Sequence, residues 1–418
     1  MSLFSAKSQL PMFILLLTSL GIMLSACSEP AMDTPTVPSN TVVYENARLL
    51  VGNGEVIENA IFSVTNGQFD VVGPAAAITL PADVNRVDLG GMTVMPAIID
   101  SHVHLSTTRD ALLEDLQNRA GQGIAAALSL GSDGLDTPLE IRAEVIPGAA
   151  RYLSAGRGIT SPEPGRSDIP HWVTTEAEAR QAVRDELARN VDFIKIWVDD
   201  RDGQYEKLSP TLYTAVIDEA HRNNLKVAAH IFALEDAKGL LRAGIDIFAH
   251  GVRDQDIDEE FMQLMRERPN VVLIPNMPYR GVPTDLDWLS GSMPQQALAA
   301  LQDTNIPRPQ AQDFFAIQAR NLARMNEEGM TIAMGTDGNS FWAPHIEMED
   351  MVASGMSEAD VIIAATRNSA ELLGLDELGT IEPGKSADFI VLEASPLDDI
   401  RNTRRIVNVY MRGELVNR

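Results

Sequence analysis

Residues 94–104 read VMPAIIDSHVH, an apolar run that ends in two histidines at alternate positions. Residues i and i+2 of a strand point to the same face, so the imidazoles of His102 and His104 can bind one ion. An isolated pair of this kind is as often two ordinary surface or core histidines. Four further candidate ligands, however, lie at or just past the ends of other short apolar runs: Lys195, His230, His250 and Asp337. In this company we interpret the pair as metal ligands.

Beyond Met95, apolar runs alternate with amphipathic helical segments. A capping box at Thr175-Glu176-Ala177-Glu178 predicts a helix towards Asn190, and Ser209-Pro210 predicts the start of another. Strands that alternate with helices form parallel sheets, and eight such units favour a closed (β/α)8 TIM barrel. Seven runs join the strand before His102 as the predicted barrel strands: Ile124 to Leu130, Arg151 to Ala155, Phe193 to Val198, Val227 to Ile231, Ile245 to Ala249, Val271 to Ile274 and Thr331 to Met334.

Short strands broken by turns occupy both ends of the chain. Four precede the barrel, within residues 42–72, and two follow it, at 388–392 and 406–411. Neither end has enough strands for a domain of its own, so we expect the ends to pair. The predicted organisation is an α/β protein in which a small β-sandwich (41–95 and 376–418) flanks the barrel (96–375).

The composition is that of a large, acidic, globular protein. The 418 residues are 45% hydrophobic, which is enough to bury an extensive core. There are 33 Lys and Arg residues against 59 Asp and Glu residues, giving a formal charge of -26. Such a surface repels polyanions and argues against nucleic-acid binding. It does not identify the substrate, because a local site can have the opposite sign.

The amino terminus is typical of a secreted protein. Lys7 precedes an uncharged, apolar-centred stretch that ends in Leu24-Ser25-Ala26-Cys27. This pattern resembles a bacterial lipoprotein signal peptide (1–26), with Cys27 as the lipidated residue. Residues 27–40, rich in proline, serine and threonine, then form a tether. The alternative is an uncleaved anchor helix. Ser28, which is not aspartate, favours the outer membrane, so we expect a lipid-anchored protein of the bacterial cell envelope facing the periplasm.

One motif points to the wrong chemistry. Residues 379–386 read GTIEPGKS and fit the phosphate-loop pattern GxxxxGK[ST]. That motif needs a strand before it and a helix after it, because the amides of the helix amino terminus hold the phosphates. Here a helical segment precedes and a strand follows. We therefore do not expect a nucleotide site.

Taken together, these motifs resemble the amidohydrolase superfamily, in the branch similar to imidazolonepropionases and metal-dependent prolidases. The resemblance extends from about Val42 to the carboxyl terminus. The GTIEPGKSAD segment (379–388) resembles a signature of the family's sheet domain. The other matching segments are MPAIIDSHVH (95–104), FIKI around Lys195, His230, AHG around His250, and GTD ending at Asp337.

The resemblance implies a centre of two divalent metal ions, with zinc as the first expectation. His102, His104 and Asp337 would bind one ion, and His230 and His250 the other. Lys195 would be carboxylated on its amine and bridge the two as a carbamate. The alternative is that Lys195 pairs with Asp199 or Asp200.

The implied chemistry is hydrolysis by a metal-bridging hydroxide that attacks a polarised carbonyl. Asp337 would act as the general acid and base, taking a proton from the water and passing it to the departing amine. The alternative role for Asp337 is a helix cap after the eighth strand. The ligand types allow zinc, manganese and cobalt.

Candidate substrate contacts lie in the loops that follow the barrel strands. Arg253, Tyr279 and Arg280 are candidates for holding a carboxylate, His171 for a carbonyl or oxyanion, and His345 for a supporting role. Many relatives have a histidine near Gly156, where this chain reads Gly156-Arg157-Gly158, so the oxyanion contact is left unassigned. The long, proline-rich connection from Asn276 to Gln310 is predicted to be a lid.

These features predict a metal-dependent amidohydrolase that cleaves a C–N amide bond, with dipeptides such as Xaa-Pro or N-acyl amino acids as small-molecule substrates. One alternative is a hydrolase of cyclic amides, similar to imidazolonepropionase, or of lactones. Another is a non-catalytic envelope binding lipoprotein built on the same barrel. The sequence leaves the exact substrate and the oligomeric state open.

Overall fold

The computed structural model describes residues 40–81 and 83–418. The predicted signal peptide (1–26), the lipidation site Cys27 and almost all of the tether (27–40) lie outside these residues. In the described ranges, no helix has both the length and the apolar character needed to cross a bilayer.

The predicted barrel is confirmed, and every predicted barrel run contains a strand. The strands form two parallel segments, β6-β7-β8 and a second running from β9 and β11 to β15. Backbone hydrogen bonds join the segments, from Ser101 N to Met334 O (2.9 Å) and from Asp192 N to Ser154 O (2.9 Å). The barrel strands are β6 (Ile98–Val103), β7 (Ile124–Ser129), β8 (Arg151–Ser154), β11 (Ile194–Trp197), β12 (Val227–His230), β13 (Ile247–Ala249), β14 (Val272–Ile274) and β15 (Thr331–Ile332).

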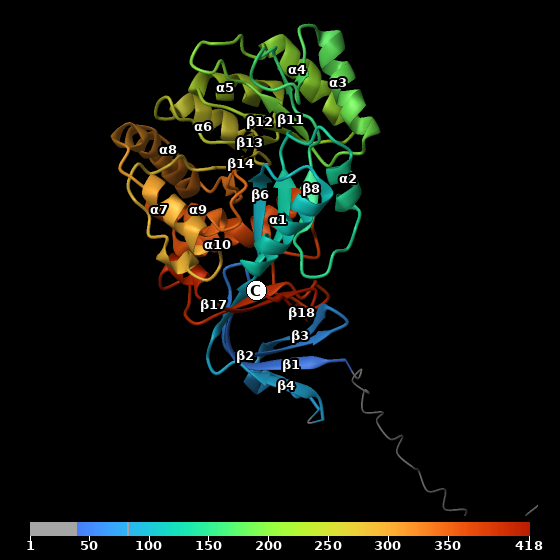
Figure 1. Cartoon of the computed structure of the whole chain (residues 1–418), viewed down its shortest axis with the longest axis vertical. Helices are drawn as coiled ribbons and strands as arrows, with labels where there is room; N and C mark the ends of the chain where they lie inside the picture. The colour runs from blue at the N-terminus through green and yellow to red at the C-terminus, as the bar shows by residue number, and fades with distance from the viewer. Residues whose placement is uncertain (1–39, 82) are drawn as a thin grey trace, which may run out of the picture. The chain divides into compact units, whose positions relative to one another are not determined.

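Helices cover the outside of the barrel strands (Figure 1). The predicted capping box is present at α3, where Thr175 Oγ1 accepts from Glu178 N and Glu178 Oε2 accepts from Thr175 N. The helices are α1 (Arg109–Gly121), α2 (Thr137–Arg142), α3 (Glu176–Ala188), α4 (Pro210–Arg222), α5 (Leu234–Ala243), α6 (Glu259–Arg266), α7 (Gln295–Thr304), α8 (Pro309–Glu327), α9 (Ala343–Ala353), α10 (Glu358–Ile363) and α11 (Ser369–Leu373), with a π-helical turn, η3 (Ala364–Asn368), between the last two. Two short strands, β9 (Ile159–Thr160) and β10 (His171–Trp172), lie in the loop after β8.

Both chain ends contribute to one separate sheet, as expected, and in Figure 1 its blue and red strands lie together. The strand order is β18-β17-β16-β5-β1-β2-β3, with β4 beside β1. The strands are β1 (Val42–Leu50), β2 (Val56–Thr65), β3 (Gln68–Pro74), β4 (Asn85–Asp88), β5 (Thr93–Pro96), β16 (Phe389–Leu392), β17 (Ile406–Met411) and β18 (Glu414–Leu415), with 3-10 turns η1 (Ala75–Ala77) and η4 (Ile400–Arg404).

This sheet curls over its own aromatic core. Four strand-to-strand steps separate Phe69 on β3 from Phe389 on β16, which is roughly 19 Å in a flat sheet. The two ring centroids are nevertheless 5.8 Å apart. Phe62 and Tyr44 fill the space between them. A single hydrogen-bonded sheet therefore encloses a core in the manner of a sandwich.

The sheet and the barrel are directly connected. β5 ends at Pro96 and β6 begins at Ile98, so the strand that pairs with β16 leads straight into the strand that contains His102. A buried ion pair, Arg151 Nη1 to Asp388 Oδ1 at 2.9 Å, links β8 to the residue before β16.

The segment that resembles a phosphate loop has the reversed context expected from the sequence. Helix α11 ends at Leu373 before it, and β16 starts at Phe389 after it. The Lys385 ammonium donates to Leu378 O at 3.2 Å, within its own turn. Nothing in this geometry forms a helix amino terminus for a nucleotide.

The connection from Asn276 to Gln310 differs from the prediction. It contains a 3-10 turn, η2 (Asp287–Leu289), and helix α7, which pack around Leu286, Leu289 and Leu298. Trp288 lies against His345 of α9, with ring centroids 5.6 Å apart. The connection has a small hydrophobic core of its own. This core was not predicted, because prolines dominate the sequence of the connection.

Candidate active site

The carboxyl ends of four barrel strands bring four histidines and an aspartate together. His102 is on β6 and His104 follows it, while His230 ends β12 and His250 follows β13. Asp337 lies in the turn after β15, with its Oδ1 3.1 Å from His102 Nε2 and 3.0 Å from His104 Nε2. Its Oδ2 is 3.5 Å from His250 Nε2, and the rings of His230 and His250 have centroids 4.4 Å apart. Five of the six predicted ligands therefore form one cluster.

Three buried nitrogens of this site have no hydrogen-bond partner among the described residues: His102 Nε2, His250 Nε2 and Lys195 Nζ. Leaving such a group unpaired costs ~1–3 kcal/mol. Burial lowers the pKa of both histidines well below the ordinary value, so each ring is neutral and has a lone pair to share. Ligand atoms of His102, His250 and Asp337 all lie within 4.8 Å of one another. Neutral imidazoles beside a carboxylate are a donor set that fits a divalent cation such as zinc.

The second ring nitrogens on β6 are held by neighbouring side chains. His104 Nδ1 is 2.9 Å from Ser132 Oγ, and His102 Nδ1 is 2.8 Å from the side-chain amide of Asn276. The Ser132 hydroxyl oxygen can accept from Nδ1–H of His104. The Asn276 amide nitrogen is the atom that faces His102, and turning this amide over would present to His102 Nδ1–H the amide oxygen, which has no other partner among the described residues. Protonation at Nδ1 leaves the Nε2 lone pair for an ion, so these contacts orient both rings as ligands.

His230 is held by its other nitrogen. Its Nε2 lies 3.0 Å from Asp199 Oδ2, and that carboxylate also accepts from Arg201 Nη1 at 2.7 Å. Arginine is only a donor, so the acceptor for His230 Nε2–H is Asp199. Burial lowers the pKa of His230 to about 4, which keeps the ring neutral. Nδ1 is then the atom available to a metal.

Lys195 is completely buried and forms no ion pair with any described residue. Burial lowers the pKa of its amine to about 7, although the charge of Asp337 acts in the opposite direction. The two alternative partners are occupied, since Asp199 pairs with Arg201 and Asp200 approaches Lys207. The neutral amine is the form that reacts with carbon dioxide, and a pKa of about 7 makes that form accessible at neutral pH, so the surroundings of Lys195 fit this modification.

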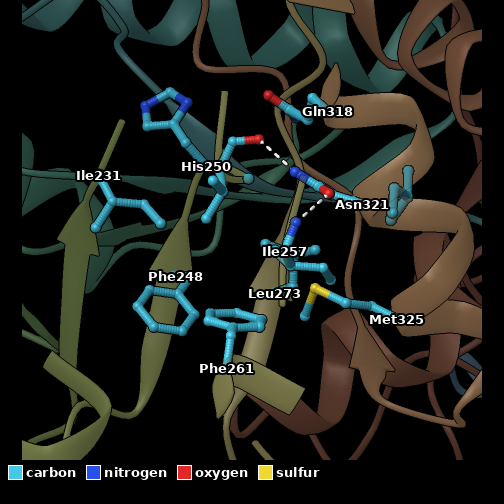
Figure 2. Close-up of a pocket in the computed structure, with 12 residues that line it drawn as sticks. Ile231, Phe248, His250, Ile257, Phe261, Leu273, Gln318, Asn321 and Met325 are labelled. Carbon is cyan, nitrogen blue, oxygen red and sulfur yellow. Dashed lines mark hydrogen bonds between the residues drawn. The ribbon is translucent and has the colours of Figure 1, made fainter. Parts of the chain in front are cut away.

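Arg253 supports His250 and is not aimed into open space. Its Nη2 donates to Asn276 O at 2.6 Å and approaches His250 Nδ1 at 3.0 Å, while its Nε donates to Gln318 Oε1 at 2.6 Å. Figure 2 shows the packed region behind His250, where Gln318 and Asn321 border an apolar cavity. That cavity has a volume of only about 10 Å³, too small for substrate. We therefore reassign Arg253 from a substrate contact to a support for the ligand.

A buried ion pair fastens the two ligand segments to each other. Asp100 accepts from Thr336 N (3.0 Å), Thr336 Oγ1 (2.8 Å) and Arg119 Nη1 (3.1 Å). Asp337 N in turn donates to His102 O at 2.8 Å, and Asp337 has a left-handed backbone with φ of 55°. Aspartate tolerates this conformation when its surroundings fix it. Asp100 and Arg119 thus hold the Asp337 turn beside β6.

Several of these supporting residues were not predicted from the sequence, although simple signals for them were present. Asp100 is two positions before His102 on a wholly buried strand, where an unpaired carboxylate is not tolerated. Asn276 follows β14 at the same strand end as the ligands. Asp100 and Asn276 could both have been predicted by considering polar residues near the ends of barrel strands as hydrogen-bond partners of the ligands as well as ligands.

A cleft with a volume of about 440 Å³ opens at the cluster. The Trp197 ring forms one wall. Gly131 (φ 94°) and Gly158 make room for this ring, because a Cβ at either position would come within 2.6 and 2.0 Å of it. The polar lining residues are His104, Ser132, Glu163, Arg166, Ser167, Arg201, His230 and Asp337. This is the space in which a substrate can reach Asp337.

Three predicted substrate contacts are engaged elsewhere. His171 Nε2 is 2.8 Å from the buried carboxylate of Glu186, and His171 does not line the cleft. Tyr279 donates to Ile306 O at 2.9 Å, and Arg280 contacts Glu349 and Asp350 of α9. No residue from Asn276 to Gln310 lines this cleft, so the lid role is also withdrawn.

The structure places His345 away from the metal ligands, which differs from its predicted supporting role. Its ring is fully buried between Thr403 Oγ1 and Gln122 O, each at 3.1 Å. Gln122 precedes β7, so this position is at the amino end of the barrel strands, opposite the metal ligands. His345 therefore has a structural role in joining α9 to η4.

Comparison with known proteins gives a consistent result. The model of the Amidohydrolase family matches residues 93–416. A solved structure of a putative prolidase from Bifidobacterium longum superposes with a TM-score of 0.75 at 27% identity, covering 91% of this chain and 95% of that one. Ochratoxinase of Aspergillus niger is 24% identical over 90% of this chain and 86% of its own length. Imidazolonepropionase of Deinococcus radiodurans is 24% identical over 87% and 93%, respectively.

Proposed function

The chain belongs to the amidohydrolase family, and on that premise we propose that it is a metal-dependent hydrolase of dipeptides or N-acyl amino acids. Its membership makes it a hydrolase of C–N bonds. The main support for this proposal is the meeting of four histidines, Asp337 and the buried Lys195, whose amine has a lowered pKa, at the carboxyl end of the barrel. The similarity to a putative prolidase supports the substrate class.

The ligand assignment follows from the free atoms. His102 Nε2, His104 Nε2 and Asp337 would hold one ion, and His230 Nδ1 with the His250 ring the second. Lys195, once carboxylated, would place an oxygen near each. Two such divalent ions, when bound, would lower the pKa of a coordinated water towards neutrality and polarise the scissile carbonyl.

Asp337 is the residue placed to move protons. Burial alone would raise the pKa of its carboxyl, but its polar surroundings, including the hydrogen bond with His104 Nε2 at 3.0 Å, lower it below the ordinary value. It is therefore a carboxylate at neutral pH, and its side chain is 36% exposed towards the cleft. It can accept a proton from the attacking water and return it to the amine, which an amide needs because amide anions are poor leaving groups.

A single experiment tests both parts of this proposal. Purified protein is assayed for metal content and, in parallel, for hydrolysis of a panel of Xaa-Pro dipeptides and N-acyl amino acids. We expect about two divalent ions per chain, and loss of activity on chelation with recovery on adding zinc. Active protein with fewer than one ion per chain would refute the metal dependence.

The second candidate is hydrolysis of a cyclic amide, favoured by the similarity to an imidazolonepropionase. Cyclic amides and lactones are therefore included in the same panel. His102→Ala separates both enzymes from a binding protein, because a pure binder does not need this ligand.

We further propose that the protein is lipid-anchored at Cys27 in the bacterial envelope, on the basis of its sequence alone. Expressed with its full amino terminus, the wild type should partition into the outer membrane fraction. The Cys27→Ala variant should carry no lipid at residue 27. A wild-type protein that carries no lipid would contradict the assignment of Cys27 as the lipidated residue.

A further inference from the structure

One buried carboxylate joins two arginines at the wall of the cleft. Glu163 has 5% of its side chain exposed. Its Oε2 accepts from Arg166 Nη1 at 2.8 Å, and its Oε1 accepts from Arg201 Nε at 3.1 Å. Both guanidinium groups line the cleft together with His104 and Asp337.

The two arginines retain unused donors. In the described part of the chain, Arg166 makes no other side-chain hydrogen bond, so its Nε and Nη2 are available, and 45% of its side chain is exposed. Arg201 also bonds Asp199 and approaches His230, which leaves Nη2. Glu163 and Asp199 together balance the charges of the two arginines, so what the wall offers a ligand is a set of unpaired guanidinium N–H donors.

The position of this wall relates it to the reacting bond. Arg201 Nη1 is 3.2 Å from Nε2 of the proposed ligand His230. One of the two arginines therefore contacts a proposed metal ligand directly. Arg166 lies farther from His230 along the chain of contacts Arg201–Glu163–Arg166. Because Arg166, His230 and Asp337 line one cleft, a substrate whose carbonyl lies at the ligand cluster can present a second group to Arg166.

Apolar side chains also line the cleft. Trp197, Ile169 and Pro170 line the same cleft, and Ile169 is 38% exposed. An anionic group against the arginines would therefore have an apolar surface beside it. This combination matches an amino acid with a free carboxylate and an apolar side chain.

We infer that Arg166, positioned by Glu163 beside Arg201, binds the carboxylate of the amino acid released by the enzyme, and so selects amides of amino acids with a free carboxylate. The inference rests on the proposed function and refines it. A guanidinium offers two parallel N–H donors to a carboxylate, a geometry that lysine does not reproduce. Arg253 and Arg280, the earlier candidates, have their donors committed to other groups.

The test compares matched substrates. The best-cleaved Xaa-Pro dipeptide and the best-cleaved N-acyl amino acid of the panel are each assayed beside their C-terminal carboxamides. For the wild type we expect kcat/KM to be about 10- to 100-fold higher on the acids, because charged hydrogen bonds are roughly worth that factor. Arg166→Met should lose most of this preference through KM on the acids, and change kcat/KM on the carboxamides less than about threefold. Arg166→Lys should retain an intermediate preference.

Arg222→Met is the matched control. Arg222 is 64% exposed and, like Arg166, contacts one glutamate, but it lies in the last turn of α4 and does not line the cleft. It should behave as wild type on all four substrates. Equal hydrolysis of acids and carboxamides by the wild type, or an unchanged preference in Arg166→Met, would overturn the carboxylate site and leave the amidase proposal standing. Absence of hydrolysis of every acid and carboxamide would instead refute the proposed function, and this inference with it.

Discussion

Replacing Asp100 with asparagine should weaken both the fold and the metal site. The Asp100–Arg119 pair is completely buried, with 0% of either side chain exposed. Asp100→Asn leaves the Arg119 guanidinium without its counter-charge, and removing one partner of such a pair costs roughly 3–5 kcal/mol. The same change places an amide N–H₂ against Arg119 and Thr336 donors, so the turn that holds Asp337 loses its attachment to β6.

The assay must separate positioning from general loss of stability. Asp388→Asn is the matched control, because Asp388 is also buried and pairs with Arg151 at 2.9 Å, at the junction of sheet and barrel and away from the ligands. Urea unfolding midpoints and half-lives at fixed temperature are measured for both variants, with zinc content after dialysis against graded chelator. We expect both variants to be less stable, but only Asp100→Asn to bind zinc more weakly, by about tenfold or more.

Two outcomes would refute this reasoning. If Asp100→Asn retained wild-type zinc affinity, the ion pair would not position the ligands. If both variants lost zinc equally, the loss would reflect general destabilisation and not the specific role of the Asp100–Arg119 pair in holding the Asp337 turn beside β6.

Three further changes test the site and its surroundings. Lys195→Met should reduce bound metal, measured by elemental analysis, to one ion or fewer per chain. It should also lower kcat, measured by steady-state kinetics, by roughly 1,000-fold. Two bound ions in this variant would contradict the bridging role of Lys195. Asp337→Asn, which removes the proton acceptor at nearly constant shape, should lower kcat roughly 100- to 10,000-fold with an unchanged circular dichroism spectrum, and a kcat within tenfold of wild type would exclude it as the acid and base. Burial raises the pKa of Asp350 to about 7 despite its contact with Arg280, so the folded state holds the carboxyl proton more tightly than the unfolded state does. The protonated carboxyl therefore adds to the free energy of unfolding; this contribution is complete below pH 4 and is lost as the pH rises through 7. The Tm of Asp350→Asn should therefore fall less than that of wild type between pH 5 and 8, and parallel curves would show that the proton is not held there.

The barrel and its main ligands were predictable from local sequence pattern. Each apolar run defines a strand, and parallel strands in a barrel necessarily bring their carboxyl ends together, so His102, His230 and Asp337 could be placed without knowing any loop. The residues that hold those ligands were harder to predict. Asn276 and Ser132 act through single hydrogen bonds that depend on the course of loops after β14 and β7.

The least predictable positions were the charged loop residues. Arg280 and Arg166 look equivalent in sequence, because each is an arginine in a loop that follows a barrel strand. In the structure Arg280 is neutralised by α9, and Arg166 remains partly exposed in the cleft. The difference arises from which helix packs against each loop, a long-range contact with no local signature. The same reason explains why His345 was placed at the wrong end of the barrel.

The pairing of β5 with β16 also has a consequence for the order in which the protein is made. Thr93–Pro96 forms antiparallel hydrogen bonds with Phe389–Leu392, roughly 300 residues later in synthesis. At about 5–20 residues per second, the ribosome takes about 15–60 s to cover that interval. During this time β5 can pair with β1 on one side only, and β6, which contains His102, is joined to a strand whose other edge is unpaired. The first strand of the barrel is thus secured by a segment translated long after it, so chains that stop before β16 cannot complete the support of the candidate active site.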